Sequence, residues 1–520
     1  MKASLIARGL SAACAVVLVA CGGHAVGAST SRSTTSDQPT TATGATSSGP
    51  APAAAPAAAG RGDWLRFDFN AQRSGVGPSS TGITSQNVGQ LRLQKVRVPG
   101  TVDSSAIELH ALTVKGRSRD VAIMTTTYGR TFALDAGTGA MLWEFTPADI
   151  HSYEGSAQIT TATPIADPDR RFVYAASPDG RIHKLLIASG HEIHSGGWPT
   201  RVTFDATHEK IASALNISGG SLLVTTGGYI GDAPPYQGHV VTISRATGRI
   251  TAVWNSLCSD RHALIRPPSS CSASDSAIWG RAGAVVEPGT GRILVTTGNA
   301  PFNGSTNWGD SVLELSSDGR TLLHNWTPAN QAQLNAQDGD LGSTSPAVLP
   351  NFHGFRLAVQ AGKDGILRLL NLSRLNGTTG RAGPRLGGEL QRIATPGSGP
   401  VFTAPAVWKH AGRIYVFLAG TSGTSAYVLS GTQPRLHVAW SDSASGTSPI
   451  LAGGLLYVFD PVGSLNVYSP TTGHKLISLP AGSGHWNSPI AVGGRVILPV
   501  GDANDHATSG VVDIYHLPGH

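Results

Sequence analysis

Side chains that could do chemistry gather in one run of this 520-residue chain, from Ser276 to Lys363. The Gly-rich loops of this run separate short apolar segments and contain Trp279, Asn299, Asp338 and Lys363. An amide oxygen or a carboxylate can hold a hard cation, a carboxylate can also take a proton, and an indole can stack on a flat ring. Because binding residues tend to lie on loops held by a rigid scaffold, we expect the functional site here.

The scaffold around this run is repetitive. Each unit starts with a small residue, Pro and an apolar residue, and continues through a turn and an apolar strand to a polar turn and a second strand. Clear copies begin at Thr163-Pro164, Ser345-Pro346, Ala404-Pro405, Ser448-Pro449 and Ser488-Pro489, and worn copies lie near Ala106, Ala214 and Gly283. Such repeats of β units are typical of propellers and solenoids.

The repeat predicts an all-β fold, an eight-bladed β-propeller of four-stranded antiparallel blades over residues 62–520. Eight units leave about 57 residues for each, enough for four strands and generous loops. Leu91–Val98 alternates apolar and basic residues. We expect this segment to close the ring by completing the last blade.

The N-terminus predicts export. Residues 1–20 combine a basic start with a short apolar stretch, as in a signal peptide. The sequence L-V-A-C-G-G around Cys21 resembles the bacterial lipobox, which implies a lipidated cysteine, a membrane anchor and a cell-envelope lipoprotein. The alternative is an ordinary signal peptide with an incidental cysteine. Residues 21–61 are almost wholly Ser, Thr, Ala, Pro and Gly, and we expect a disordered tether there.

Charge and cysteine content exclude some functions. The formal charge of +6 is spread without a basic run, so nucleic-acid binding is not expected. Cys258 and Cys271 enclose a segment rich in Pro and Ser, and in an exported chain we expect them to form a disulfide. No C-x-x-C motif supports zinc or thiol catalysis.

One turn of the repeat carries a specific motif. Residues 133–143 read A-L-D-A-G-T-G-A-M-L-W, or A-x-D-x-x-T-G-x-x-x-W. This resembles the tryptophan-docking motif of the quinoprotein dehydrogenase propellers, in which the Trp packs between neighbouring blades while Asp and Thr-Gly form the turn. Residues 62–520 as a whole resemble the pyrroloquinoline quinone (PQQ) repeat superfamily. That superfamily contains dehydrogenases of alcohols, sugars and polyvinyl alcohol, and also non-catalytic propellers of the cell envelope.

The resemblance implies roles for four residues and two cofactors, PQQ and Ca²⁺. Trp279, in A-I-W-G, is similar to the Trp beneath the quinone, and Asn299, in T-G-N-A-P-F-N, to a calcium ligand. Asp338 matches the general base that takes the proton of the substrate hydroxyl beside the metal. Lys363, in K-D-G, is similar to the cation that binds the quinone oxygens. The alternatives are a core Trp, a Gly-Asn turn, carboxylates in a β-turn and an exposed turn Lys.

Some features depart from the dehydrogenases. The loop that should supply a Glu ligand, Gly227–Tyr236, has none, and only Asp232 could replace it. The family's adjacent cysteines and the His and Trp before Asp338 are also missing. Two hypotheses therefore stay open: a PQQ- and Ca²⁺-dependent dehydrogenase of a small alcohol or sugar, and a non-catalytic propeller that binds proteins or glycans at the cell envelope.

Overall fold

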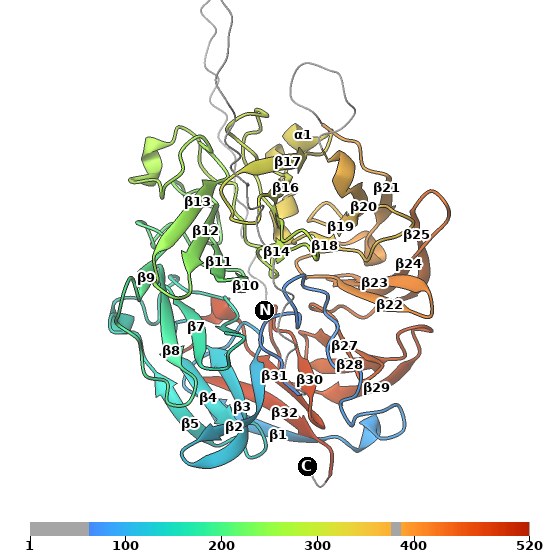
Figure 1. Ribbon diagram of the computed structural model, residues 1–520. Coiled ribbons are helices and arrows are strands. Elements are labelled where there is room, and N and C mark those ends of the chain that lie inside the picture. Colours follow the sequence, from blue (N-terminus) through green and yellow to red (C-terminus); the bar gives the residue numbers. More distant parts are fainter. Residues whose placement is uncertain (1–61, 376–385, 519–520) are drawn as a thin grey trace, which may run out of the picture. The chain divides into compact units, whose positions relative to one another are not determined.

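The computed structural model describes residues 62–375 and 386–518. Their strands form eight four-stranded antiparallel sheets, which Figure 1 shows as blades around a common axis. This confirms the predicted all-β, eight-bladed propeller. The predicted signal peptide (residues 1–20) and the tether (residues 21–61), which includes Cys21, lie outside the described residues.

The first four blades follow one another along the chain. Blade 1 contains β2 (Ile107–Val114), β3 (Arg117–Thr125), β4 (Thr131–Asp135) and β5 (Met141–Phe145). Blade 2 contains β6 (Ile165–Ala166), β7 (Phe172–Ser177), β8 (Arg181–Leu186) and β9 (Thr200–Arg201). Blade 3 contains β10 (Asn216–Ser218), β11 (Ser221–Thr225), β12 (His239–Ser244) and β13 (Ile250–Asn255). Blade 4 contains β14 (Val285–Val286), β15 (Ile293–Thr296), β16 (Val312–Leu315) and β17 (Leu322–Trp326).

The last four blades continue the ring. Blade 5 contains β18 (Ala347–Val348), β19 (Leu357–Gln360), β20 (Ile366–Asn371) and β21 (Gln391–Ala394). Blade 6 contains β22 (Ala406–His410), β23 (Arg413–Gly420), β24 (Gly423–Ser430) and β25 (Arg435–Asp442). Blade 7 contains β26 (Ile450–Ala452), β27 (Leu455–Asp460), β28 (Ser464–Tyr468) and β29 (Lys475–Pro480). Blade 8 contains β30 (Ile490–Val492), β31 (Arg495–Val500), β32 (Gly510–His516) and β1 (Arg92–Val98).

Helices are few and short. Within the described residues the only α-helix is α1 (Gln331–Ala336). The 3-10 helices are η1 (Val88–Gln90), η2 (Ile150–Ser152), η3 (Pro268–Ser270), η4 (Leu341–Ser343), η5 (Leu372–Arg374), η6 (Pro396–Ser398) and η7 (Ala503–Asp505). No helix among the described residues is long and apolar enough to cross a membrane.

The predicted repeat units coincide with the blades. Thr163-Pro164 stands directly before β6, and Ser345-Pro346 directly before β18. The first strands of blades 5 to 8 lie against one another in sequence, β18 on β22, β22 on β26 and β26 on β30, so the first strand of a blade is its innermost strand. β18, β26 and β30 are buried along their length, and β22 is buried at Ala406 and Val407, as their apolar residues predict.

The two ends of the folded chain share one blade. β1 pairs with β32 in antiparallel register from Arg92 opposite His516 to Val98 opposite Gly510. The predicted closing strand, Leu91–Val98, is thus confirmed. Since full closure removes the exposed edges of a curved arrangement of sheets, this pairing keeps blades 1 and 8 together.

Docked tryptophans join neighbouring blades, as the motif predicts. Trp143 on β5 donates its indole N–H to the carbonyl of Ile187 in blade 2 at 2.7 Å. Its ring lies against Gly190, where an added Cβ would come within 2.5 Å of it. Trp440 on β25 repeats the contact with Gly473 of blade 7. The motif's Asp135 accepts the backbone N–H groups of residues 137 and 138, which forms the turn.

The segment from Trp64 to Thr81 crosses the space that the first strands enclose. Along the chain, its backbone bonds in turn to Glu108, Ala166, Val286, Val407, Leu451 and Gly494, which belong to or adjoin the first strands of blades 1, 2, 4, 6, 7 and 8. The buried Arg73 adds hydrogen bonds to the carbonyls of Ala282, Ala214 and Leu215. This segment, the inner strap, therefore blocks the centre of the ring.

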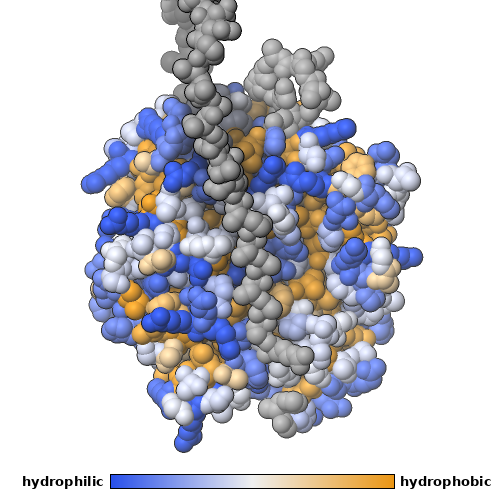
Figure 2. All heavy atoms as spheres, viewed as in Figure 1, coloured by the Kyte–Doolittle hydropathy of each residue, from blue (hydrophilic) through white to orange (hydrophobic). Residues whose placement is uncertain are grey.

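Hydrophilic side chains are spread over the face in view in Figure 2 and alternate with hydrophobic ones. Among the described residues, the large hydrophobic side chains that are exposed are scattered over several blades: Met141, Phe204, Ile230, Leu386, Leu390, Val438 and Val462. Single exposed hydrophobic residues are normal on protein surfaces. The apolar content of the chain is thus mainly inside the blades and between them.

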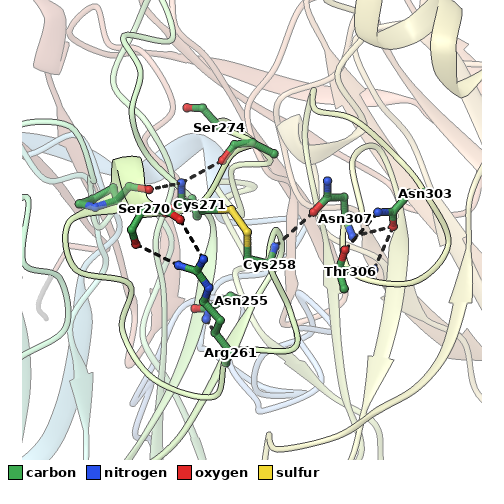
Figure 3. The surroundings of a disulfide bond; sticks show 12 residues. Asn255, Cys258, Arg261, Ser270, Cys271, Ser274, Asn303, Thr306 and Asn307 are labelled. Carbon is green, nitrogen blue, oxygen red and sulfur yellow. Dashed lines mark hydrogen bonds between the residues drawn. A yellow bond between two sulfur atoms is a disulfide. The ribbon is translucent and has the colours of Figure 1, made fainter.

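Cys258 and Cys271 form a disulfide, which confirms the predicted pairing (Figure 3). Arg261 ties the closed loop to itself through two hydrogen bonds to Ser270, at 2.9 and 2.8 Å. The loop also bonds to the long turn of blade 4, because the backbone N–H of Cys258 donates to Asn307 Oδ1 at 3.2 Å. The disulfide loop is therefore part of the connections around blades 3 and 4.

The docking contact predicts a difference between two glycines with the same backbone angle. Gly190 and Gly116 both have φ of 72°, but only Gly190 faces a Trp ring, and nothing lies within 4 Å of a Cβ added at Gly116. We expect Gly116→Ala to lower the free energy of unfolding by about 1 kcal/mol through backbone strain. We expect Gly190→Ala to lower it by about 2–4 kcal/mol, because Trp143 must also move. Urea unfolding measures both, and equal losses would contradict the docking role.

Candidate functional site

The four residues predicted to bind the cofactor, the metal or the substrate lie at one end of the propeller. We call this end of the propeller the loop face. In each four-stranded antiparallel blade, the first strand starts at this end, the turn from the second to the third strand lies there, and the fourth strand ends there. The loop face carries Trp279 between β13 and β14, Asn299 between β15 and β16, Asp338 between β17 and β18, and Lys363 between β19 and β20. Blades 3, 4 and 5 therefore present these side chains from neighbouring connections.

Asp338 is the point where the predicted residues meet. Lys363 Nζ lies 2.6 Å from Asp338 Oδ1, and Asn299 Nδ2 donates to the same oxygen at 2.6 Å. Lys363 Nζ also lies 5.5 Å from the centre of the Trp279 ring. The structure thus brings all four residues together.

Asp340, two residues after Asp338, completes this group. Its Oδ2 accepts the indole N–H of Trp279 at 2.9 Å and lies 3.6 Å from Lys363 Nζ. Asp340 also lies close to the backbone of Gly298. A Cβ at position 298 would come within 2.6 Å of Asp340 Oδ1, so this position requires a glycine. The sequence D-G-D displays Asp340 beside Asp338, but sequence reasoning gave it no role.

The two carboxylates differ in exposure and therefore in what they can do. The side chain of Asp338 is 64% exposed, whereas that of Asp340 is 7% exposed. Burial raises the pKa of Asp340 to about 6, although Lys363 and the Trp279 hydrogen bond pull it down. Burial alone would lower the pKa of Lys363, but Asp340 and Asp338 outweigh it and raise that pKa. Asp338 is thus the accessible carboxylate, and Asp340 orients Trp279 and Lys363.

One oxygen at this site is suited to a metal ion. Asn299 Oδ1 is buried and has no hydrogen-bond partner, although its amide N–H₂ group is engaged by Asp338. An amide oxygen beside a carboxylate is a donor pair for a hard cation such as Ca²⁺. Calcium takes six to eight oxygens. Asn299 and Asp338 fit this chemistry and would supply part of the set, with the cofactor and water supplying the rest.

The loop that lacks the expected Glu also reaches this site. Asp232 is exposed and accepts the hydroxyl of Tyr236 at 2.9 Å. Its charge helps to raise the pKa of Lys363, after the larger influence of Asp340 and Asp338. Asp232 therefore lies on the same side of the loop face as the predicted residues. It adds a negative charge there but makes no direct contact with Asn299.

A second group of side chains at the loop face was missed by sequence reasoning. Asp103, Arg281, Phe402 and Trp486 each stand four residues before the first strand of a blade: β2, β14, β22 and β30. They thus occupy one position of the repeat, and the small-Pro step that follows Phe402 and Trp486 could have marked it in those two blades. Trp279 lies among them, with ring centres 6.1 Å from Phe402 and 5.5 Å from Trp486.

Asp103 fixes the blade 8 side of this group. It accepts the backbone N–H groups of Trp486 and Ala503, each at 3.1 Å, and His485 Nδ1 lies 2.8 Å from its Oδ2. Burial alone would raise the pKa of Asp103, but the hydrogen bonds and the charges of His485 and Arg281 lower it. Asp103 therefore holds His485 and Trp486 in place as a buried anion.

Asp502, on the last loop, joins His485 at 3.5 Å. Asp103, His485 and Asp502 offer ligand atoms within 4.8 Å of one another. Two cations, Arg281 and Lys210, lie near enough to interact electrostatically with the Asp103 carboxylate. The group is thus explained as a charge-balanced network without a metal.

A cavity of about 660 Å³ lies elsewhere, beside the disulfide loop between β13 and β17. Its lining includes Trp254, His262, Phe302, Trp308, Arg320 and His324. None of the four predicted residues borders it, and its only imidazole with a close acidic partner is His324, 2.6 Å from the buried Glu314. The candidate functional site is therefore the group around Asp338, and this cavity is separate from it.

Comparisons with known proteins agree with this architecture. No family model and no curated protein sequence matches the chain. Among solved structures, it is similar to quinohemoprotein alcohol dehydrogenase from Comamonas testosteroni, at 15% identity and a TM-score of 0.63 over 89% of this chain and 82% of that one. The fold is that of the quinohemoprotein alcohol dehydrogenases.

Two further structures show the same likeness. Quinohemoprotein alcohol dehydrogenase ADHIIG from Pseudomonas putida HK5 has 15% identity and a TM-score of 0.65 over 88% of this chain and 81% of that one. A europium-containing methanol dehydrogenase has 15% identity and a TM-score of 0.62 over 88% of this chain and 98% of that one. At this identity the likeness shows the fold alone, so the chemistry must be argued from the residues present.

Asp310 is a second buried acid beneath the site. Its Oδ1 accepts the backbone N–H of Leu341 at 3.2 Å, and its Oδ2 lies 3.4 Å from the amide nitrogen of Gln331. Burial, reinforced by the charge of Asp340, raises the pKa of Asp310 to about 8. At neutral pH this carboxyl therefore keeps its proton.

The raised pKa of Asp310 predicts that stability falls as the pH rises from about 4 to about 8, because the unfolded state releases this proton first. The stabilisation is fully present below the unfolded pKa of about 3.9 and is lost as the pH rises through about 8, because the folded state resists ionisation. We expect Asp310→Asn to be more stable than the parent at pH 9 by at least about 1 kcal/mol. Thermal unfolding from pH 5 to pH 9 measures this.

The control for this experiment is Asp318→Asn, because the Asp318 side chain is 58% exposed. Burial alone would raise the pKa of Asp318, but hydrogen bonds and the charge of Arg320 lower it. Its folded and unfolded forms are both ionised across this pH range. We therefore expect the control to keep the pH dependence of the parent. A parent-like slope in Asp310→Asn would contradict the assignment.

Proposed function

We propose that the protein is a quinoprotein-like dehydrogenase that oxidises a hydroxyl group of an alcohol or a sugar with PQQ and Ca²⁺. The observation that carries this is the meeting of Trp279, Asn299, Asp338 and Lys363 at one point of the loop face. The shared fold of the quinohemoprotein alcohol dehydrogenases supports the proposal.

Each residue at this site would have its own role in binding or catalysis. Trp279 would stack on PQQ, Lys363 would bind its oxygens, and Asn299 with Asp338 would hold Ca²⁺. Bound PQQ would supply the oxidant, since a quinone can accept two electrons and hydrogen from an alcohol. Asp338, exposed beside this place, would take the proton of the substrate hydroxyl at a carboxylate oxygen. Asp340 keeps Trp279 and Lys363 in their orientation.

A binding propeller without catalysis is the second candidate. It is favoured by the Gly227–Tyr236 loop, which has no Glu, and by the charge of Lys363, which already neutralises Asp338. Such a protein would bind an envelope protein or a glycan on the loop face. The buried, unbonded Asn299 Oδ1 counts against this candidate, because a buried acceptor without a partner is costly.

Calorimetric titration with PQQ decides between the candidates. We expect the protein to bind PQQ in the presence of Ca²⁺ with micromolar or better affinity, and binding to weaken strongly without Ca²⁺ or in Trp279→Ala. Trp408→Ala is the matched control, because Trp408 is a half-buried indole on β22, outside this group. No binding of PQQ with or without Ca²⁺ would reject the dehydrogenase.

The same preparations test the base. Asp338→Asn keeps the shape and one carbonyl oxygen but removes the proton acceptor. We expect it to lose dye-linked alcohol or sugar oxidation by about 10²-fold or more, the usual contribution of general base catalysis, even at concentrations of Ca²⁺ and PQQ that saturate the variant. An unchanged rate would show that Asp338 is not the base.

We also propose that the protein is exported and anchored to a membrane through lipid on Cys21, as a cell-envelope lipoprotein. The lipobox-like sequence around Cys21 and the apolar stretch before it support this. We expect Cys21→Ser to abolish incorporation of labelled palmitate and to release the protein from the membrane fraction. Labelling that persists in Cys21→Ser would reject the anchor.

A further inference from the structure

Charged side chains are divided unevenly between the two ends of the propeller. The end opposite the loop face, here called the turn face, carries the turns from the first to the second strand and from the third to the fourth strand of each blade. Exposed cations that lie in or beside these turns, and that form no ion pair with another described residue, are Lys115, Arg117, Arg171, Lys409, Arg413 and Arg435.

Exposed acids gather at the other end. On the loop face, or at strand ends beside it, they are Glu144, Asp149, Asp232, Asp260, Asp338 and Asp505. Exposed arginines accompany these acids: Arg201, Arg261 and Arg266. Among the described residues of the turn face, the only exposed acids are Asp169 and Asp318, and Arg320 lies 3.5 Å from Asp318. The positive charge that is spread along the sequence is therefore gathered in space at the turn face.

The described chain begins at this same face. Gly62 lies against His110 near the turn-face end of β2, where an added Cβ would come within 3.0 Å of the His110 Cβ. Asp63 accepts the backbone N–H of His110 at 2.8 Å and pairs with Arg170, in the first turn of blade 2, at 3.1 Å. Gly62 therefore joins the predicted tether to the propeller at the turn face.

An anionic membrane surface fits this arrangement. Anionic phospholipid headgroups attract Lys and Arg side chains near the surface by about 1 kcal/mol each. A flexible tether of about 40 residues has a root-mean-square length of about 35 Å, so an anchor at Cys21 would hold the turn face near the membrane. A polynucleotide would also attract the cations, but the attachment of the tether at this face favours the membrane.

We infer that the turn face docks on the anionic headgroups of a phospholipid membrane and holds the loop face, with Asp338, away from it. The inference goes beyond the proposed dehydrogenase and does not depend on PQQ. The contact orients the propeller and does not replace the lipid anchor, because attraction through a few exposed cations is weak and reversible. Cys21→Ser is therefore still expected to leave the membrane fraction of cells.

Co-sedimentation with sucrose-loaded vesicles tests the docking face. The protein is the full chain with Cys21→Ser, so that no attached lipid contributes. We expect it to bind vesicles of phosphatidylcholine with about one-third phosphatidylglycerol about ten-fold or more tighter than vesicles of phosphatidylcholine alone, at about 0.15 M salt. We expect this preference to disappear at about 1 M salt, because the ions screen the attraction.

Reversal of two charges locates the contact. In the same background, Lys115→Glu with Arg117→Glu places two acids at the first turn of blade 1, and we expect it to weaken binding to the mixed vesicles about ten-fold or more. The matched control is Arg201→Glu with Arg266→Glu, which changes the net charge by the same amount but on the loop face. We expect the control to bind like the Cys21→Ser protein.

A second pair of cations keeps the test independent of one turn. Lys409→Glu with Arg413→Glu makes the same change at the first turn of blade 6, and we expect the same loss of binding. Circular dichroism verifies that each variant is folded. If the blade 1 variant does not fold, the blade 6 variant takes its place.

The outcomes are distinct. Equal binding by the turn-face variants and the loop-face control, or binding that does not depend on phosphatidylglycerol, would overturn the inference. Tighter binding to duplex DNA than to the mixed vesicles at the same salt concentration would assign the face to a polynucleotide and overturn it as well. Selective vesicle binding that the turn-face variants lose, together with no palmitate labelling of the unaltered chain, would keep the docking face and reject the anchor.

Discussion

The pairing of β1 with β32 is the constraint on which the rest of the structure depends. It joins residues near the start of the folded chain to residues near its end, and so fixes the order and spacing of eight blades. Each site residue lies on a connection between strands, and its position relative to the others is set by the blades that carry it. Asp103 and His485 illustrate this, since they are 382 residues apart in sequence but only 2.8 Å apart in space.

Much of the fold could be predicted because the same physical need recurs in every blade. The first strands are apolar where they pack beside their neighbours, and in five blades a step of a small residue and Pro marks where the strand begins. Trp143 and Gly190 follow a similar rule between neighbouring blades, because the large ring in one blade requires a glycine in the next. The closing strand was visible because its alternation of apolar and basic residues suits an outer strand.

The site could be predicted only in part. Trp279, Asn299, Asp338 and Lys363 stand in local motifs, and the structure brings them together as those motifs indicate. Phe402 and Trp486 stand just before small-Pro steps of the repeat, but their contact with Trp279 joins blades that are distant in sequence, which no local motif shows. Asp340 stands beside Asp338 in the sequence, but its role depends on its burial and on the hydrogen bond that it accepts from the Trp279 indole. Neither can be read from the sequence.

The inner strap has a consequence for traffic through the molecule. Because the segment from Trp64 to Thr81 bonds to the first strands of six blades, and Arg73 fills the space beside it, the ring is a cup and not a tube. A small molecule that enters at the loop face must leave by the same mouth. If the protein is the proposed dehydrogenase, its substrate and product would use the same opening.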